Sequence, residues 1–257
     1  MISKNTSYKL LSTLLMVLST TSCFLKKPDL NKEQASTYHH MGNFTSKHAD
    51  YKRAANLYKK AYKLDPSKSN SLLALAKVQI MMGQYEQAVS TYHKVLRQDK
   101  NNKQAKQGLA AAYFTSGEPI EAAEQWQQSL SQDPKNVEAL NGLGLVMEQL
   151  HNYKGAQACF KVALKSSPES SLLLNNLGLT MALQGEVPHG IEQLRAAQKI
   201  APSERLKNNI SLLQSIAKNE ASIDMLVDKL NAAFPKQKNA VTAEDKNTLN
   251  KYVQKWC

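Results

Sequence analysis

Two asparagines are the side chains of this chain best suited to binding another molecule. Asn141 and Asn175 lie 34 residues apart, at the same place of a recurring pattern. An amide side chain both donates and accepts hydrogen bonds, so it can pair with the backbone of an extended peptide. The alternative interpretation is that these amides cap local turns or bind water.

Catalytic and metal-binding motifs are missing from the rest of the sequence. His39 and Asn43 lie four residues apart on one helix face, but no nearby cysteine or carboxylate completes a zinc site. The sequence has no HExxH motif, no glycine-rich phosphate loop and no GxSxG nucleophile turn. We therefore expect a protein that is not an enzyme and that uses no metal, cofactor or small-molecule substrate.

The elements that position these side chains repeat every 34 residues. Small residues at the eighth and twentieth places, such as Gly178 and Gly190, let two antiparallel helices approach closely. A bulky side chain at the twenty-fourth place fills the gap to the next pair, and Met81, Met147 and Met181 are predicted to be packing residues. The pattern fills five consecutive blocks: 35–68, 69–102, 103–136, 137–170 and 171–204.

These columns resemble the tetratricopeptide repeat (TPR). They include the seventh place (Met41, Leu75, Leu109, Leu143 and Leu177) and the twenty-fourth (Tyr58, Tyr92, Trp126, Phe160 and Leu194). The resemblance implies an all-α fold, a right-handed superhelical solenoid of about five TPR helix pairs plus C-terminal capping helices.

A solenoid of this kind lines its concave surface with the first helix of each block. The second, fifth, ninth and twelfth places are predicted to face that groove, including Glu148 in the fourth block. Chaperone-binding TPR proteins hold a terminal carboxylate with a lysine and asparagine clamp, which is missing here, so chaperone docking is disfavoured. The candidate residues of a peptide-binding groove are His39, Asn43, Lys77, Gln107, Phe114, Asn141, Leu145, Asn175 and Leu179.

The N-terminus has the features of an export signal. Lys4 and Lys9 precede the apolar run Leu10–Leu18, which is too short to span a bilayer, and small residues then lead to Cys23. That ending resembles a bacterial lipobox, although Thr20 stands where an aliphatic residue is usual. An uncleaved leader, or cleavage elsewhere, is the alternative.

The lipobox resemblance implies a lipoprotein anchored to the membrane through Cys23. The residue after Cys23 is not aspartate, which indicates the outer membrane, with the protein facing the periplasm. The expected organisation is a signal peptide at 1–22 and a tether at 23–34.

The net charge of +12 is concentrated at the two ends of the chain. A basic surface favours anionic membranes or acidic partners. No stacking aromatics alternate with the lysines and no nucleic-acid-binding motif is present, so we expect no nucleic acid partner.

The other two cysteines show no spacing typical of a metal site or a disulfide framework. Cys159 is expected to be a small buried residue, and Cys257 a free thiol.

The C-terminal side departs from the repeat. Residues 205–230 are interpreted as a degenerate sixth repeat that caps the core, in which Asn208 and Asn209 echo Asn175 and Asn176 with a shift of one residue. Residues 231–257 contain a break and then an amphipathic helix that begins at Thr242. Its apolar face is predicted to dock on the solenoid or on a partner, and it comprises Leu249, Tyr252, Val253 and Trp256.

The run Asn175–Gly185, NNLGLTMALQG, and the later NNISL resemble the TadD group, which are TPR lipoproteins of the tight-adherence (Flp pilus) assembly system. The resemblance implies a non-enzymatic scaffold in assembly of a cell-envelope pilus or secretion machine, with a secretin or other pilus components as partners. Pilotin lipoproteins of type IV pili share this layout. The alternative is an envelope adaptor that recruits or regulates peptidoglycan-modifying enzymes, and a cytoplasmic adaptor would require an uncleaved leader.

Overall fold

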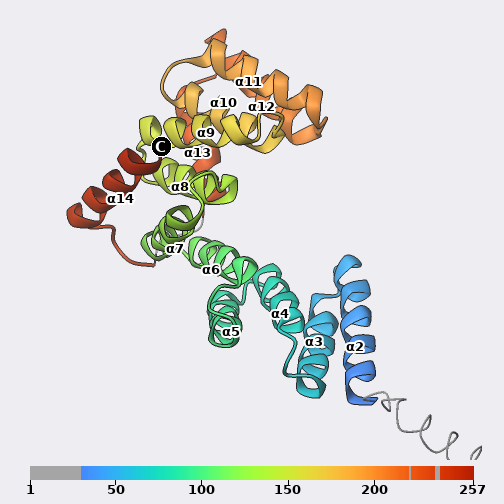
Figure 1. Ribbon diagram of the computed structural model, residues 1–257. Helices are drawn as coiled ribbons and strands as arrows, with labels where there is room; N and C mark the ends of the chain where they lie inside the picture. Colours follow the sequence, from blue (N-terminus) through green and yellow to red (C-terminus); the bar gives the residue numbers. More distant parts are fainter. Residues whose placement is uncertain (1–29, 220, 235–237) are drawn as a thin grey trace, which may run out of the picture.

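The computed structural model describes residues 30–219, 221–234 and 238–257, and these form thirteen helices and no strand. Successive helices pair side by side and stack into an elongated superhelix (Figure 1). The predicted all-α solenoid is therefore confirmed. Its helix pairs are α2 (Leu30–Lys47) with α3 (Tyr51–Leu64), α4 (Asn70–Met81) with α5 (Tyr85–Gln98), α6 (Lys103–Thr115) with α7 (Pro119–Gln132), α8 (Val137–Gln149) with α9 (Tyr153–Ser166), α10 (Ser171–Leu183) with α11 (Val187–Ile200), and α12 (Glu204–Ala217) with α13 (Ile223–Ala233).

Each of the five sequence blocks contains one of these pairs, and the sixth block contains α12 and α13. At the N-terminal end, α2 begins at Leu30, so the helix extends into the stretch 23–34 that the sequence assigned to a tether. Glu33 in its first turn favours this start because a carboxylate stabilises the positive end of the helix dipole. The predicted signal peptide and Cys23 lie outside the described residues.

Local sequence explains several of the helix starts and turns. Asn102 and Asn136 cap α6 and α8, because each side-chain oxygen accepts a hydrogen bond at 3.0 Å from a backbone N–H three residues on. Gly117 and Gly185 reverse the chain within a pair, at φ of +83° and +87°, where glycine has no Cβ penalty.

The predicted packing columns form the core, with two exceptions. Tyr92, Phe160 and Met147 are fully buried, and Met181 is 9% exposed. Met81 is 62% exposed, so its prediction as a packing residue is wrong: it is the last residue of α4 and points out at the turn. Met41 is 42% exposed, since no helix among the described residues precedes α2 to cover its outer face.

Two paired helices touch backbone to backbone at Gly178 of α10 and Gly190 of α11. A Cβ at Gly190 would lie 2.5 Å from the carbonyl oxygen of Gly178, and one at Gly178 would lie 2.7 Å from that of Gly190. The sequence prediction that small residues permit this contact is confirmed.

Gly190→Ala is expected to lower the free energy of unfolding by about 1–3 kcal/mol, because the new methyl group must push two backbones apart. Denaturant unfolding followed by circular dichroism measures the change. Gly155→Ala is the matched control, since its Cβ would meet only the Asn152 side chain, at 3.0 Å or more. Equal stability of the two variants would contradict the backbone contact.

The C-terminal part returns along the superhelix. After α13 the chain passes back to α7, and α14 (Ala243–Trp256) then lies against α7, α8 and α9 (Figure 1). Thr242 and Asp245 form the predicted capping box, with the Thr242 backbone donating to Asp245 Oδ2 at 2.9 Å. Leu249 is 1% exposed, and Tyr252, Val253 and Trp256 pack on the same core, so docking on the solenoid itself is confirmed.

Cys159 and Cys257 form a disulfide, with their Cα atoms 4.5 Å apart. The prediction of a free thiol at Cys257 is therefore wrong. The error came from spacing: the two cysteines lie 98 residues apart, and only the return of α14 to α9 brings them together.

Candidate protein-interaction groove

The concave surface is open at its N-terminal end. A hollow of about 380 Å³ lies between α2, α4 and the start of α6, and its walls include His39, Asn43 and Lys77. These three residues come from places that the sequence predicted to face the groove, and the structure brings them together. The remaining walls mix amide and apolar side chains: Ser46, Tyr58, Asn70, Leu73, Ala74, Val78 and Gln104.

Hydrogen bonds fix two of these side chains in place. Asn43 Oδ1 accepts a hydrogen bond from the Tyr58 hydroxyl at 2.8 Å, and His39 Nδ1 lies 3.1 Å from Ser71 Oγ. Burial, together with the neighbouring His40, holds the pKa of His39 below its usual value, and burial raises the pKa of Tyr58. His39 is therefore a neutral hydrogen-bonding group near pH 7, which leaves the exposed ammonium of Lys77 as the cation of these three.

The two residues predicted for the middle of the groove, Gln107 and Phe114, lie in different surroundings. Gln107 lines a separate hollow of about 290 Å³ near the end of α7 and the start of α8. Phe114 contacts Phe234, the residue after α13, edge-on with ring centroids 6.2 Å apart. The chain itself thus covers the groove at Phe114.

At the C-terminal end, the asparagines form a ladder of hydrogen bonds inside the protein. Lys229 Nζ donates to Asn209 Oδ1 at 2.8 Å, and Asn209 Nδ2 donates to Asn175 Oδ1 at 2.9 Å. Asn175 Nδ2 then donates to Asn176 Oδ1 at 3.1 Å, and Asn176 Nδ2 donates to Asn141 Oδ1 at 3.0 Å. Asn175 is 4% exposed, so its amide is engaged within the fold. Contact with a peptide stays a prediction, and of this pair the half-buried Asn141 is the accessible member.

This ladder also corrects the predicted register of the sixth unit. Asn209 lies 34 residues after Asn175 and donates a hydrogen bond to it, so α12 is in register with the repeat here. The sequence had suggested a shift of one residue. The 34-residue spacing of Asn141, Asn175 and Asn209 is the sequence signal that points to the ladder. Nothing local in the sequence indicates Lys229 as its terminal donor.

The apolar candidates at this end are mostly covered. Leu179 is 5% exposed and packs with Leu213 and Leu226 in a core shared by α10, α12 and α13. Leu145 is half-buried on the core of the third and fourth units. Leu172 and Asn175 line a hollow of about 290 Å³ at this end, whereas the N-terminal hollow brings together three of the candidate residues.

Glu148 is a carboxyl group buried inside the superhelix. It was predicted to face the groove, yet it is 4% exposed, and its Oε1 accepts a hydrogen bond from Thr180 Oγ1 at 3.0 Å. Burial raises the pKa of Glu148 to about 7, against the smaller opposing effect of the Thr180 bond.

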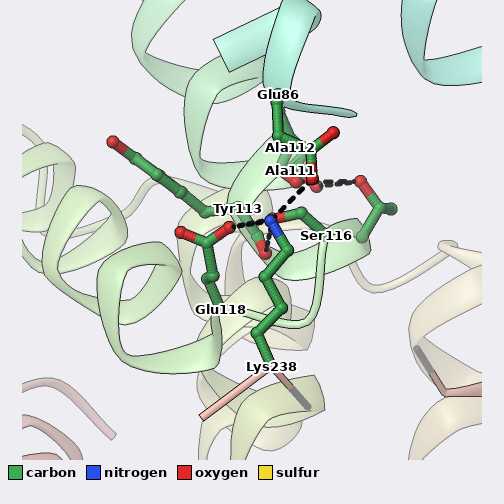
Figure 2. A network of polar contacts seen from close by, with 8 residues as sticks. Glu86, Ala111, Ala112, Tyr113, Ser116, Glu118 and Lys238 are labelled. Carbon is green, nitrogen blue, oxygen red and sulfur yellow. Dashed lines mark hydrogen bonds and ion pairs between the residues drawn. The ribbon is translucent and has the colours of Figure 1, made fainter. Parts of the chain in front are cut away.

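Lys238, in the connection between α13 and α14, is held by two carboxylates. Its Nζ lies 2.8 Å from Glu86 Oε1 and 2.8 Å from Glu118 Oε1, and its backbone N–H donates to the Gly117 carbonyl at 2.8 Å. Figure 2 shows the lysine reaching toward both carboxylates beside the last turn of α6. Glu118 and Glu86 hold the pKa of Lys238 above its usual value, and Lys238 holds the pKa of Glu86 below its own. Nothing in the sequence indicated this contact, because its partners lie 152 and 120 residues away.

Within the described ranges, no group of three or more histidine, cysteine, aspartate or glutamate side chains could hold a metal ion. Across those same residues, every helix is too short or too polar to cross a bilayer.

Comparison with known proteins bears on the repeat itself. Family models of the tetratricopeptide repeat match residues 47–112, 108–155 and 147–205, which together span more than half of the chain. No curated protein matches the sequence.

Several solved structures share the fold at low identity. The TPR protein TTC0263 of Thermus thermophilus is 18% identical over 70% of this chain and 98% of its own, with a TM-score of 0.61. Pseudomonas aeruginosa pilF is 17% identical over 79% of this chain and 99% of its own, with a TM-score of 0.59. YrrB, described as a TPR protein with an unusual peptide-binding site, is 23% identical over 73% of this chain and 97% of its own, with a TM-score of 0.50.

The helix pairs, the packing columns and the family match lead to one conclusion. The chain belongs to the tetratricopeptide-repeat family, and its solenoid is a scaffold for protein–protein interactions.

Proposed function

We propose that this scaffold acts at the cell envelope, in assembly of a pilus or secretion machine of the tight-adherence or type IV pilus kind. In this proposal the N-terminal hollow binds a secretin or another pilus component. The observation that carries the binding part of the proposal is the open hollow at His39, Asn43 and Lys77, which brings together three residues predicted to face the groove. Amide and ammonium groups beside apolar walls suit an extended peptide with a carboxylate or carbonyl opposite Lys77.

The envelope placement is supported by the disulfide. Cross-links such as Cys159–Cys257 persist in oxidising compartments, including the bacterial periplasm, and are rare in the cytosol. An oxidising compartment outside the cytosol agrees with the predicted export signal and with the lipobox-like cysteine at position 23.

The lipid anchor has a direct test. Radiolabelled palmitate should enter the wild-type chain and fail to enter Cys23→Ser. The same cells, fractionated into inner and outer membranes, should carry the labelled chain in the outer membrane. Absence of label in the wild type would remove the lipoprotein part of the proposal and leave the groove part intact.

The groove part is tested by site-specific photo-crosslinking in intact cells. A crosslinker at position 74, which also lines the hollow, is expected to capture a secretin or a pilus subunit. Asn43→Ala is expected to weaken that capture by about 1 kcal/mol, roughly fivefold, because a hydrogen bond between the Asn43 amide and the bound segment is lost. A crosslinker at Lys161, an exposed residue of α9, is the control position. Capture at 161 but not at 74 would overturn the assignment.

The second candidate is an envelope adaptor that recruits or regulates peptidoglycan-modifying enzymes. The same hollow and the same disulfide support it, since neither feature selects the partner. The crosslinking experiment separates the two, because capture of a peptidoglycan hydrolase at position 74 favours the adaptor.

A further inference from the structure

Phe234 and Lys238, in the connection from α13 to α14, contact three residues that are remote in the sequence. These are Glu86 on α5, Phe114 on α6 and Glu118 at the N-cap of α7. We name these three residues the acidic cradle. Phe234 and Lys238 sit on it, four residues apart in the sequence.

The contacts have the form of peptide recognition. An aromatic ring meets Phe114 at 6.2 Å, an ammonium lies 2.8 Å from each carboxylate, and the Lys238 backbone bonds the Gly117 carbonyl at 2.8 Å. Side-chain pockets joined by a main-chain hydrogen bond are how extended segments are bound by folded domains.

Two of the three residues of the acidic cradle are positioned by partners other than the lysine. Ser116 Oγ donates to Glu118 Oε1 at 2.8 Å and shares its proton with the Tyr113 carbonyl at 2.9 Å. The Phe114 ring lies against Trp126, with centroids 5.9 Å apart, in the core of the third unit. Glu118 and Phe114 therefore remain in place when the lysine leaves.

The segment with Phe234 and Lys238 is held at the acidic cradle mainly because the helices on both sides of it are fixed. Glu86 is 71% exposed and Lys238 is 38% exposed, and ion pairs open to water contribute little on their own. On one side the connection continues from α13, which packs on α10, and on the other it leads to α14, which is joined to α9 by the disulfide. Tethering at both ends gives the segment a high effective concentration at the cradle.

We propose that the acidic cradle is a docking site for an extended protein segment with an aromatic residue followed four positions later by a lysine. The segment of this chain carrying Phe234 and Lys238 fills the site in cis, and a partner segment binds by displacing it. The site is separate from the N-terminal hollow and does not depend on the envelope assignment.

The test uses the full oxidised chain and a fluorescent peptide with the sequence of residues 230–242. Phe234→Ser with Lys238→Ser empties the cradle and leaves α14 and its disulfide in the chain. This emptied variant is expected to bind the peptide at least about tenfold more tightly than the wild type, because the competing tethered segment is gone. Lys251→Ser, on an exposed lysine of α14, is the matched control and should bind as weakly as the wild type.

Charge reversal tells a docking site from a general loosening of the fold. In the emptied variant, Glu86→Lys with Glu118→Lys should abolish binding of the original peptide and restore binding of a peptide in which the lysine at position 238 is glutamate. The affinity of the original cradle for the original peptide, and of the charge-reversed cradle for the glutamate peptide, should both fall as the salt concentration rises. The proposal is overturned if the emptied variant binds no more tightly than the wild type, or if both peptides bind the unaltered cradle equally.

Discussion

Cys257→Ser is expected to lower the free energy of unfolding of the C-terminal half by about 4 kcal/mol. The disulfide joins residues 98 apart, and a cross-link that closes a loop of this length removes a large part of the entropy of the unfolded chain. It also holds α14 in place, and Leu249 and Trp256 of that helix pack against the core of the third and fourth units. Loss of the cross-link therefore acts on α7, α8, α9 and α14 together.

Hydrogen exchange of α14 amides, with denaturant unfolding of the whole chain, measures this effect. Cys159→Ala is the matched variant: it breaks the same cross-link from the other side, so it should reach a similar stability. A reducing agent should bring the wild type to that level and leave both variants unchanged. Unaltered protection of α14 in Cys257→Ser would contradict a stabilising role for the disulfide.

Glu148→Gln is expected to stabilise the protein at pH 8 and to leave its stability at pH 4 unchanged. The folded-state pKa of Glu148 is about 7 against an ordinary 4.5, so the folded state keeps a proton that the unfolded state loses as pH rises through this window. Stability is then full below about pH 4.5, falls as pH rises, and is lowest above about pH 7, a total loss of about 3 kcal/mol. Glutamine resembles the protonated carboxyl and retains an oxygen for Thr180, so it avoids this loss.

The measurement is the denaturation midpoint of wild type and variant between pH 4 and pH 8. Taking the difference between the two proteins removes the pH dependence that they share. Glu124→Gln, on an exposed carboxylate past the first turn of α7, is the control and should show no such gain in relative stability at pH 8. A difference that stays constant from pH 4 to pH 8 would contradict a buried, protonated Glu148.

The sequence predicted the architecture well because the repeat is governed by packing. Gly178 and Gly190 must be small for two backbones to touch, and Tyr92 and Phe160 must be large to fill the gap between pairs. Such constraints recur every 34 residues and can be recognised from the spacing alone. The apolar face of α14 was predictable for the same reason, since Leu249 and Trp256 follow the period of a helix.

The contacts that shape the groove were not predictable from the sequence, because they join segments distant in the chain. Cys257 meets Cys159, and Lys238 meets Glu86, only after the chain has turned back from α13. The amide of Asn175 likewise appeared free to face a ligand until α12 placed Asn209 against it. A repeat pattern specifies neighbours along the stack and gives no information on a return of the chain.

That return changes the mechanics of the molecule. In an ordinary solenoid each unit contacts only its neighbours, so the whole stack can extend and twist through small changes between adjacent units. Here the C-terminal connection joins units that are not adjacent, through Lys238 on the α5–α7 region and Cys257 on α9. The connection therefore restrains the superhelix between α5 and α9 against extension, while α2, α3 and α4 lie outside this restraint. The open hollow is lined mainly by α2 and α4, so a ligand bound there can shift these helices without stretching the cross-linked part.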